Sequence, residues 1–243
     1  MNTIGVDKEL KSLCVIPARG GSKRIPRKNI RPFAGKPIIS YSIEVALKSH
    51  LFERIIVSTD DSEVAEFALR AGAEVPFLRS SEAANDFATL ADVIDEVRLE
   101  YSRINPDPDF LCCILATSPL LDSASLSVGY EMLRDGSDVG KVHSVVRFGY
   151  PIQRALDMSA EGDLRMLWPE NRQSRSQDLP ARYRDAGQFY WMPYRPLSQR
   201  HRVLGLEVSE LDSQDIDTEE DWRMAEIKYL QKHGRLDMTG IVS

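Results

Sequence analysis

The sequence predicts an α/β protein with a mainly parallel sheet, and three observations lead to this prediction. Short apolar runs alternate with segments whose apolar residues recur at helical spacing, a pattern typical of a sheet covered by helices on both faces. The chain has 243 residues, 42% hydrophobic and 28% charged, which suits one domain with a large core. A Gly- and Arg-rich loop follows the first apolar run, at the end of a strand where open α/β sheets bind ligands. We therefore treat residues 1–243 as a single domain.

The first half of the chain carries a regular alternation of strands and helices. Its apolar runs predict strands at residues 13–18, 54–59, 74–78 and 110–116. Segments with helical spacing predict helices at residues 38–49, 63–71, 89–101 and 125–134. Asp60 and Glu63 lie three residues apart and resemble a capping box, which predicts the start of the second of these helices.

The alternation stops after residue 146. Residues 147–183 are polar, contain several Arg and Pro residues together with Trp168, and show no helical spacing. We therefore expect an inserted flap or β-subdomain at about residues 147–186. The remaining predicted elements are strands at residues 141–146, 188–191 and 203–208 and a closing helix at residues 218–231, whose Trp222 and Ala225 are available for docking.

Composition excludes several classes of protein. The net charge is −6, so no global basic field exists to hold nucleic acid. The three cysteines, Cys14, Cys112 and Cys113, are typical of core thiols in a reducing compartment. The first apolar run, preceded by Asp7, lacks the length and the flanks of a signal peptide or a membrane span. We expect a cytoplasmic protein without a nucleic-acid or membrane partner.

The loop after the first predicted strand has the composition of a phosphate site. It reads Arg19-Gly-Gly-Ser-Lys-Arg-Ile-Pro-Arg-Lys-Asn29. Its glycines allow a close backbone approach with N–H groups facing anionic oxygens. Positive charge comes from Arg19, Lys23, Arg24, Arg27 and Lys28. The loop has neither a Walker A motif nor GxGxxG, which disfavours ordinary kinases and dinucleotide-binding enzymes. A solvated basic loop is the alternative, but the position at a strand end favours phosphate binding.

Several separated motifs resemble one family. Residues 16–29 are similar to the N-terminal signature of the CMP-sialic acid synthetases, which are cytidylyltransferases. The similarity continues in order through Ile56-Val-Ser-Thr-Asp60, Pro76-Phe-Leu-Arg79, Ala116-Thr-Ser-Pro119 and Gln214-Asp-Ile-Asp-Thr-Glu-Glu219. The resemblance implies a three-layer α/β/α, Rossmann-like nucleotidyltransferase fold with a small inserted dimerisation subdomain.

Within that family, one branch fits best. Residues 151–155, 168–171, 175–179 and 185–191 resemble the branch that activates pseudaminic acid. The implied reaction is attack of the anomeric hydroxyl of a nine-carbon α-keto acid sugar, a nonulosonic acid, on the α-phosphate of CTP. The products are pyrophosphate and a CMP-sugar, here CMP-pseudaminic acid for surface glycan or flagellin glycosylation. Synthesis of CMP-legionaminic acid or CMP-N-acetylneuraminic acid is the alternative.

The resemblance places the nucleotide on the basic loop. It implies catalytic roles for Arg19 and Lys28, which neutralise phosphate charge as pyrophosphate leaves, and for Asp217, as a metal ligand or as a candidate base for the sugar hydroxyl. The implied nucleotide and phosphate ligands are Ala18, Arg19, Gly20, Gly21, Ser22, Lys23, Lys28, Asn29, Arg79 and Thr89. Without the resemblance, the sequence is also compatible with Arg79 as a surface arginine at the end of a strand.

A pair of carboxylates near the C-terminus suggests a metal site. Asp215 and Asp217 lie on one face if the segment is extended, with Ile216 turned toward the core. A triphosphate normally arrives with Mg²⁺, and Mn²⁺ is a possible substitute. The spacing alone leaves open that Asp217 is the N-cap of the last helix with Glu220 at N3; the resemblance implies a metal-binding Asp pair. The prolines of Asp107-Pro-Asp109 favour a plain turn.

The acceptor is an acid, so its carboxylate needs an arginine or backbone donors. The candidates in the irregular segment are Arg154, Arg172, Arg175, Arg182 and Arg184. The resemblance assigns sugar contacts to Arg175 and Arg184. For Arg172 and Arg182 we expect solvent-exposed side chains without a role in binding. Further sugar-site candidates are Thr117, Ser118 and Gln188. In the family this segment reaches toward the partner's site, which implies a homodimer with sites completed across the interface.

Two departures from the sialic acid enzymes concern the acceptor and the ribose. Leu115 and Ala116 stand where those enzymes carry a Gln, and their Ser/Thr-rich stretch is reduced here to residues 86–89. Because of the second change, the resemblance gives weaker support to a contact between Thr89 and the ribose. A less polar wall suits the terminal deoxy carbon of pseudaminic acid, although it does not exclude legionaminic acid.

Two other functions compete with this interpretation. A nucleotide-sugar-dependent glycosyltransferase carries its carboxylate pair after a mid-sheet strand, whereas the pair here lies near the C-terminus. A nucleic-acid module with residues 19–31 as a basic arm is disfavoured by the net charge. The four histidines, His50, His143, His201 and His233, show no metal or triad spacing and receive no catalytic role.

Overall fold

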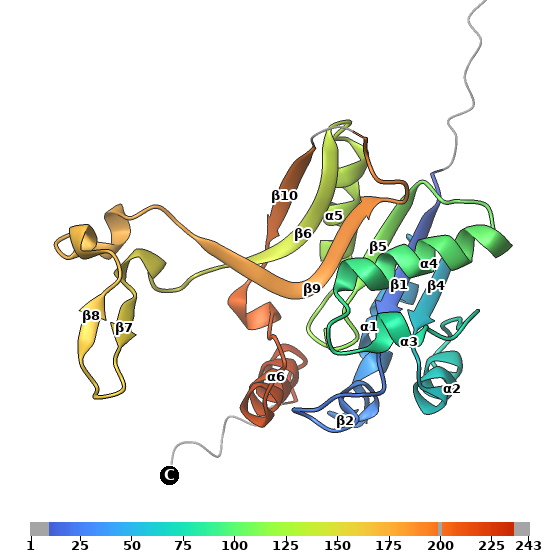
Figure 1. Ribbon diagram of the computed structural model, residues 1–243, viewed down its shortest axis with the longest axis horizontal. Helices are drawn as coiled ribbons and strands as arrows, with labels where there is room; N and C mark the ends of the chain where they lie inside the picture. The colour runs from blue at the N-terminus through green and yellow to red at the C-terminus, as the bar shows by residue number, and fades with distance from the viewer. Residues whose placement is uncertain (1–9, 199–200, 236–243) are drawn as a thin grey trace, which may run out of the picture.

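One six-stranded sheet, in the order β10-β6-β9-β5-β1-β4, forms the centre of the protein in a computed structural model that describes residues 10–198 and 201–235 (Figure 1). The strands are β1 (Ser12–Pro17), β4 (Arg54–Ser58), β5 (Phe110–Ile114), β6 (Val139–Arg147), β9 (Tyr183–Pro193) and β10 (Arg202–Glu207). Only β9 runs antiparallel to its neighbours in this sheet, and the other pairings are parallel. The predicted mainly parallel sheet is confirmed.

Helices cover both faces of this sheet. They are α1 (Ile38–Ser49), α2 (Ser62–Arg70), α3 (Ser81–Ala84), α4 (Leu90–Ile104), α5 (Ser123–Arg134) and α6 (Glu219–Lys232). Cys14 of β1 packs in a core with α1, α2 and α5, while its neighbour Leu13 packs in a second core with α4. Cys112 and Cys113 divide between the same two cores, because successive strand side chains face opposite ways. The three-layer prediction is therefore confirmed, and all three thiols are free and buried.

A third, aromatic core anchors α6. It joins Phe33 of β2 (Pro32–Phe33) and Tyr41 of α1 to Trp222 and Ala225 of α6. Phe33 makes edge-on ring contacts with Tyr41 and Trp222, each with 5.5 Å between centroids. The short strand β3 (Lys36–Pro37) completes the hairpin with β2, and η1 (Lys28–Ile30) precedes it. The predicted docking of the closing helix is confirmed, and it fixes the position of the segment just before α6.

Three local expectations were wrong. The strand predicted at residues 74–78 is reduced to one bridge between Glu74 and Ile56, and Pro76, which has no N–H to donate, follows it. The N-cap of α2 is Asp61, not Asp60, because the Asp61 side chain accepts the N–H groups of the helix's first turn. The N-cap of α6 is Thr218, in a capping box with Asp221, so the alternative that Asp217 caps this helix is also wrong.

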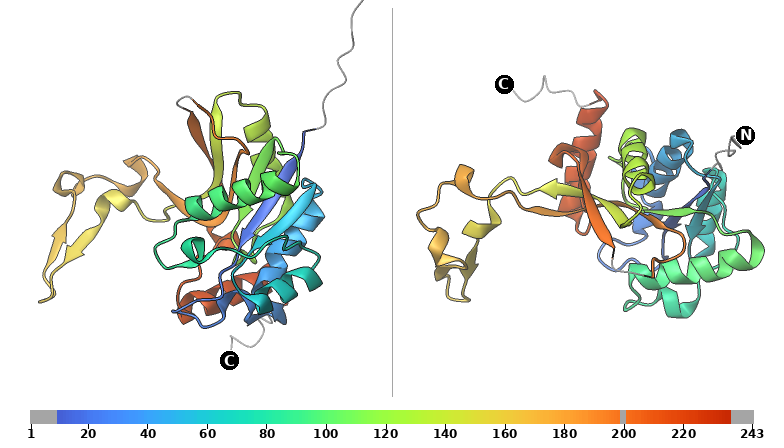
Figure 2. Two further views of the ribbon diagram at one scale, coloured as in Figure 1. Left: turned by 45° about the vertical axis from the view of Figure 1, so that its right-hand side comes forward. Right: turned by 90° about the horizontal axis from the view of Figure 1, so that it is seen from above.

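Residues 148–182, hereafter the arm, leave the sheet between β6 and β9 and project away from the body of the protein (Figures 1 and 2). They correspond to the flap expected at about residues 147–186. The arm contains the hairpin β7 (Leu156–Met158) and β8 (Leu164–Met166) with the short helices η2 (Ile152–Arg154), η3 (Pro169–Asn171) and η4 (Ser176–Asp178). Another short helix, η5 (Glu210–Asp212), links β10 to the segment before α6.

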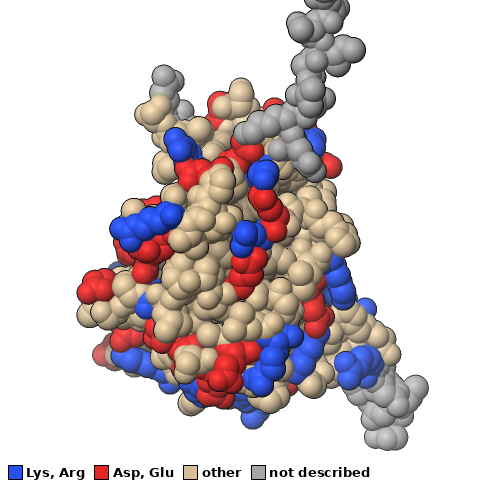
Figure 3. All heavy atoms as spheres, turned by 90° about the vertical axis from the view of Figure 1, so that its right-hand side faces the viewer, with Lys and Arg blue, Asp and Glu red and all other residues tan. Residues whose placement is uncertain are grey.

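The surface offers no broad field of one charge on the side drawn in Figure 3, where acidic and basic side chains are intermixed. Across residues 10–198 and 201–235, no helix is both long and apolar enough to cross a membrane. Asp7, which precedes the first apolar run, lies outside the described residues.

Candidate active site

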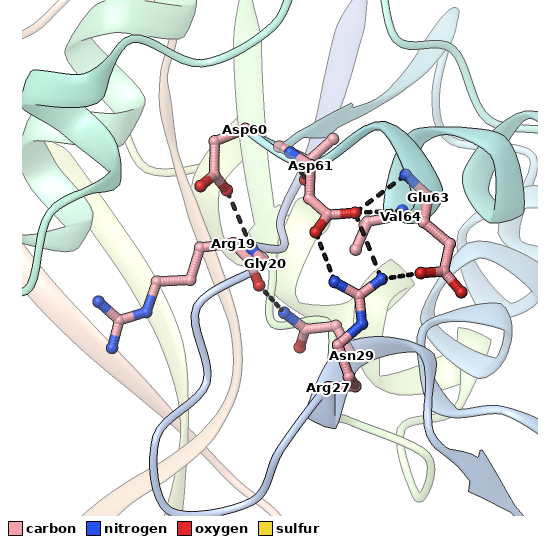
Figure 4. A network of polar contacts seen from close by, with 9 residues as sticks. Arg19, Gly20, Arg27, Asn29, Asp60, Asp61, Glu63 and Val64 are labelled. Carbon is pink, nitrogen blue, oxygen red and sulfur yellow. Dashed lines mark hydrogen bonds and ion pairs between the residues drawn. The ribbon is translucent and has the colours of Figure 1, made fainter.

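The basic loop between β1 and η1 is tied to its surroundings at both ends (Figure 4). At its start the Gly20 N–H donates to Asp60 Oδ1 at 2.9 Å, and at its end the Asn29 side-chain amide donates to the Arg19 carbonyl at 2.9 Å. A Cβ atom on Gly20 would lie 2.5 Å from Asp61 Oδ2, so only glycine fits this close approach. These contacts set the course of the backbone around the site.

Arg27 clamps the loop onto the first turn of α2. Its guanidinium pairs with Asp61 and Glu63, while its own backbone adopts a left-handed conformation with φ of 56°. The hydrogen bond from Arg27 lowers the pKa of Asp61, although desolvation opposes this shift. Figure 4 shows the Arg19 and Arg27 side chains pointing to opposite sides of the loop. Arg27 therefore holds the loop in place, and Arg19 is directed toward the pocket.

Two of the amides expected to face an anion are occupied within the protein. The Gly20 N–H is bound by Asp60, and the Ser22 N–H donates to the Gly20 carbonyl at 3.0 Å. In this conformation the loop offers an anion its side chains, because these two N–H groups already have partners.

A pocket of about 320 Å³ lies between the basic loop, the ends of β1 and β5, and the segment that leads into α4. Among its lining residues are the predicted ligands Arg19, Ser22, Lys23, Lys28, Asn29, Arg79, Thr89 and Thr117. Ala18 is fully buried and Ser118 is 3% exposed, so both support the site from within. Leu115 and Ala116 also line the pocket and give it the apolar wall expected from the sequence.

Asp86 neutralises two cations in this pocket. Its carboxylate lies 3.1 Å from Arg19 Nη1 and also pairs with Lys23. These groups are partly or mostly exposed, so the two ion pairs contribute little to stability. The sequence analysis missed this partner because Asp86 and Arg19 are 67 positions apart.

Arg79 is a buried part of the pocket wall. Its side chain donates through Nε to Ser58 Oγ at 3.0 Å and through Nη2 to the Ser58 carbonyl. Burial lowers the pKa of Arg79, while the charges of Asp60 and Glu96 oppose that shift. The residue is 7% exposed, so the alternative of a surface arginine is wrong.

Asp215 and Asp217 do not line this pocket themselves, but both interact electrostatically with Lys28, which does. Ile216 between them is fully buried in the aromatic core, as predicted, and fixes the segment. Lys28 donates to the Ile216 carbonyl at 2.6 Å and lies 3.7 Å from Asp217 Oδ1. Burial lowers the pKa of Lys28, and the charges of Asp217 and Asp215 oppose the shift. Arg24 completes the group with an ion pair to Asp217 at 2.8 Å.

Other predicted sugar residues lie apart from this pocket. Arg175 is an exposed residue of the arm, and Arg184, at the base of the arm, pairs with Glu210 at 3.7 Å. Gln188 is buried, and its side-chain amide donates to the Asp212 carbonyl at 2.6 Å. The other candidate arginines of the arm, Arg154, Arg172 and Arg182, likewise do not line the pocket.

Comparison with known proteins identifies relatives over almost the whole chain. A family model described as cytidylyltransferase matches residues 13–232. A pseudaminic acid cytidylyltransferase of Campylobacter jejuni is 40% identical over 230 residues, which cover 92% of this chain and 98% of the relative.

More distant relatives carry related names. An N-acylneuraminate cytidylyltransferase of Danio rerio is 36% identical over 89% of this chain and 50% of its own length. A CMP-N,N'-diacetyllegionaminic acid synthase of Legionella pneumophila is 40% identical over 45% of this chain and 47% of its own length. A solved CMP:2-keto-3-deoxy-manno-octonic acid synthetase in complex with CTP has a TM-score of 0.66, with 18% identity and coverage of 92% of this chain and 99% of that one, which supports the fold.

Proposed function

Because the chain belongs to the cytidylyltransferase family, we propose that it activates pseudaminic acid with CTP and releases CMP-pseudaminic acid and pyrophosphate. The similarity to the Campylobacter jejuni enzyme, over nearly the full length of both chains, supports the choice of acceptor. The observation that carries the proposal is the juxtaposition of a cationic pocket, containing Arg19 and Lys28, with the Asp215–Asp217 pair. This combination is what transfer of a nucleotidyl group requires.

In the proposed reaction, the anomeric hydroxyl oxygen of the acceptor forms a bond to the α-phosphorus of CTP. The bond from that phosphorus to the oxygen of the departing pyrophosphate breaks, and the hydroxyl proton passes to a base, for which the Asp217 carboxylate is one candidate. Negative charge grows on the departing oxygen, and Arg19, Lys23 and Lys28 neutralise it. Lys28 is held by the Ile216 carbonyl, so its ammonium group needs little reorganisation during the reaction.

The Asp215–Asp217 pair fits a Mg²⁺ site, with Mn²⁺ as a substitute. Two carboxylates two positions apart offer the hard oxygen ligands that this ion prefers. Among residues 10–198 and 201–235, no group of three or more His, Cys, Asp or Glu side chains is arranged to hold a metal by itself. Such a pair suits an ion that takes its remaining ligands from phosphate and water. When bound, the ion neutralises phosphate charge as a Lewis acid.

The rest of the pocket suits the nucleoside. Arg79 presents a guanidinium whose position is fixed by Ser58, and the pocket is also lined by Asn29, from the loop, and by Thr89, from the start of α4. The Thr89 hydroxyl already caps α4 by accepting the Asp92 N–H. A contact from the Thr89 hydroxyl to the ribose therefore has to leave this hydrogen bond to the Asp92 N–H intact.

The proposed assembly is a homodimer formed through the arm. Cross-strand pairing of Leu156 with Met166 and of Met158 with Leu164 places four apolar side chains on one face of the hairpin. Leu156, Met158 and Leu164 are each more than half exposed, an apolar surface of the kind that marks a protein interface. The arm projects away from the body of the protein (Figure 2), and Arg175 does not line the pocket of its own chain, so we propose that Arg175 serves the partner's acceptor site.

The test is pyrophosphate release from CTP with Mg²⁺, with pseudaminic, legionaminic and N-acetylneuraminic acids offered in parallel. ATP, GTP and UTP serve as nucleotide controls. Turnover restricted to CTP and pseudaminic acid is the expected result. Turnover with another acid retains the reaction but overturns the proposed acceptor, and no release with any acid overturns the proposed reaction.

A further inference from the structure

Arg24 belongs to the basic loop but has no part in the reaction as described so far. Its side chain lines the pocket and forms an ion pair with Asp217, with 2.8 Å between Arg24 Nη2 and Asp217 Oδ1. The Lys28 ammonium lies 3.7 Å from the same Oδ1 atom. Two cations therefore converge on one oxygen of the carboxylate pair that is proposed to hold a divalent metal.

Asp217 is the fixed member of this ion pair, and Arg24 is the mobile one. The Asp217 N–H donates to Asp221 Oδ2 at 3.2 Å, and the preceding residue, Ile216, is fully buried. The Arg24 side chain keeps 68% of its surface exposed, against 38% for Asp217 and 22% for Lys28. Because an exposed ion pair contributes little to stability, Arg24 can leave Asp217 without disturbing the fold.

A bound triphosphate offers Arg24 a stronger partner in the same pocket. Burial lowers the pKa of Lys28, and the nearby charge of Arg24 lowers it further, so the two cations are close enough to repel each other. A triphosphate carries more negative charge than one carboxylate, and a guanidinium binds phosphate oxygens in a bidentate geometry. A divalent cation and a guanidinium compete for one carboxylate oxygen, because like charges repel strongly at such short distances.

We propose that Arg24 exchanges Asp217 for the phosphates of CTP, and that metal binding at Asp217 therefore follows nucleotide binding. Without nucleotide, Arg24 occupies Oδ1 and lowers the affinity of the Asp215–Asp217 pair for a divalent cation. Bound nucleotide draws Arg24 to its phosphate oxygens and leaves Asp217 free to act as a ligand. Arg24 is thus a positioning residue that acts through Asp217. This inference rests on the proposed function.

The first measurement is Mn²⁺ binding to the full chain without nucleotide, followed by the electron paramagnetic resonance signal of the free ion. Arg24→Gln should bind Mn²⁺ about two- to fivefold more tightly than wild type, the effect of one exposed ion pair. Asp217→Asn and the double variant Arg24→Gln/Asp217→Asn should bind Mn²⁺ equally, because the gain requires the Asp217 carboxylate. Lys23→Gln is the matched control. It removes the same charge from the neighbouring position, but Lys23 pairs with Asp86, so its Mn²⁺ affinity should equal that of wild type.

The second measurement is CTP binding by titration calorimetry in the presence of EDTA. Arg24→Gln should bind CTP more weakly, by about the same factor as it gains for Mn²⁺. One substitution then shifts the two affinities in opposite directions, which a general loss of structure does not do.

Three results overturn the inference. An unchanged Mn²⁺ affinity in Arg24→Gln shows that Arg24 does not compete with the metal, and an unchanged CTP affinity shows that it does not reach the phosphates. A loss of both affinities with a lower Tm shows that Arg24 only supports the loop. A wild-type protein that releases no pyrophosphate with any acid overturns the proposed function, whereas the two affinities still decide this inference.

Discussion

Gly20→Ala tests whether the close approach of the basic loop to α2 keeps the pocket in shape. The added Cβ would stand 2.5 Å from Asp61 Oδ2 and 2.7 Å from Asp61 Cβ, so either Asp61 or the loop must move. Asp61 caps α2 and pairs with Arg27, and the Gly20 N–H itself binds Asp60. One methyl group therefore disturbs the helix cap and the loop clamp together.

The size of the effect follows from these contacts. Loss of an N-cap costs about 1 kcal/mol, and loss of a hydrogen bond to a charged group costs about 1.5–3 kcal/mol. We expect the free energy of unfolding to fall by about 2–4 kcal/mol. In a chain of this length each kcal/mol lowers Tm by about 2–4 °C, so Tm falls by about 10 °C.

Gly21→Ala is the matched control for stability. A Cβ on Gly21 meets no atom within 4 Å among the described residues, and Gly21 is not among the glycines with positive φ. Its Tm should therefore stay at the wild-type value in calorimetry or circular dichroism. In Gly20→Ala we also expect a higher KM for CTP, because Arg19 moves with the loop. Equal Tm values for Gly20→Ala and Gly21→Ala would show that the contact between Gly20 and Asp61 does not limit stability.

Three further predictions concern the carboxylates and the arm. Asp217→Ala should abolish pyrophosphate release with little change in Tm, because its ion pair with Arg24 is exposed; normal turnover would remove Asp217 from the catalytic set. Asp61→Asn should lower stability in urea unfolding at about pH 7, and the difference from wild type should shrink as pH falls below the ordinary carboxyl pKa. Since the bond from Arg27 lowers the pKa of folded Asp61, its stabilisation is present above the ordinary carboxyl pKa and is lost as pH falls through the lowered value; a difference that persists in acid contradicts this. Leu164→Glu should give a monomer in ultracentrifugation with an unchanged far-UV circular dichroism spectrum, because this side chain is 63% exposed in the single chain; an unchanged dimer mass would overturn the proposed interface.

The regular elements could be predicted from sequence because their signals are local. The runs that form β1, β4 and β5 and the helical spacing of α1, α4 and α5 depend on residues close together in the chain. The element ends were less accurate: β9 begins at Tyr183 rather than 188, and α4 ends at Ile104 rather than 101. Helix caps and strand ends depend on which hydrogen-bond partners are near. Asp60 accepts the Gly20 N–H from the basic loop, and Asp61 is the residue that caps α2.

Local sequence patterns were enough to predict the layered α/β architecture, the cationic loop at the end of the first strand, and the extended Asp215–Asp217 pair with Ile216 turned inward. Which of the charged side chains remain available to a ligand depends on the three-dimensional fold. It directs Arg27 to α2, places Asp86 against Arg19 and attaches Lys28 to the segment before α6. The physical reason is that hydrophobic periodicity acts between neighbours in the chain, whereas charge pairing depends on distance in space between groups far apart in sequence.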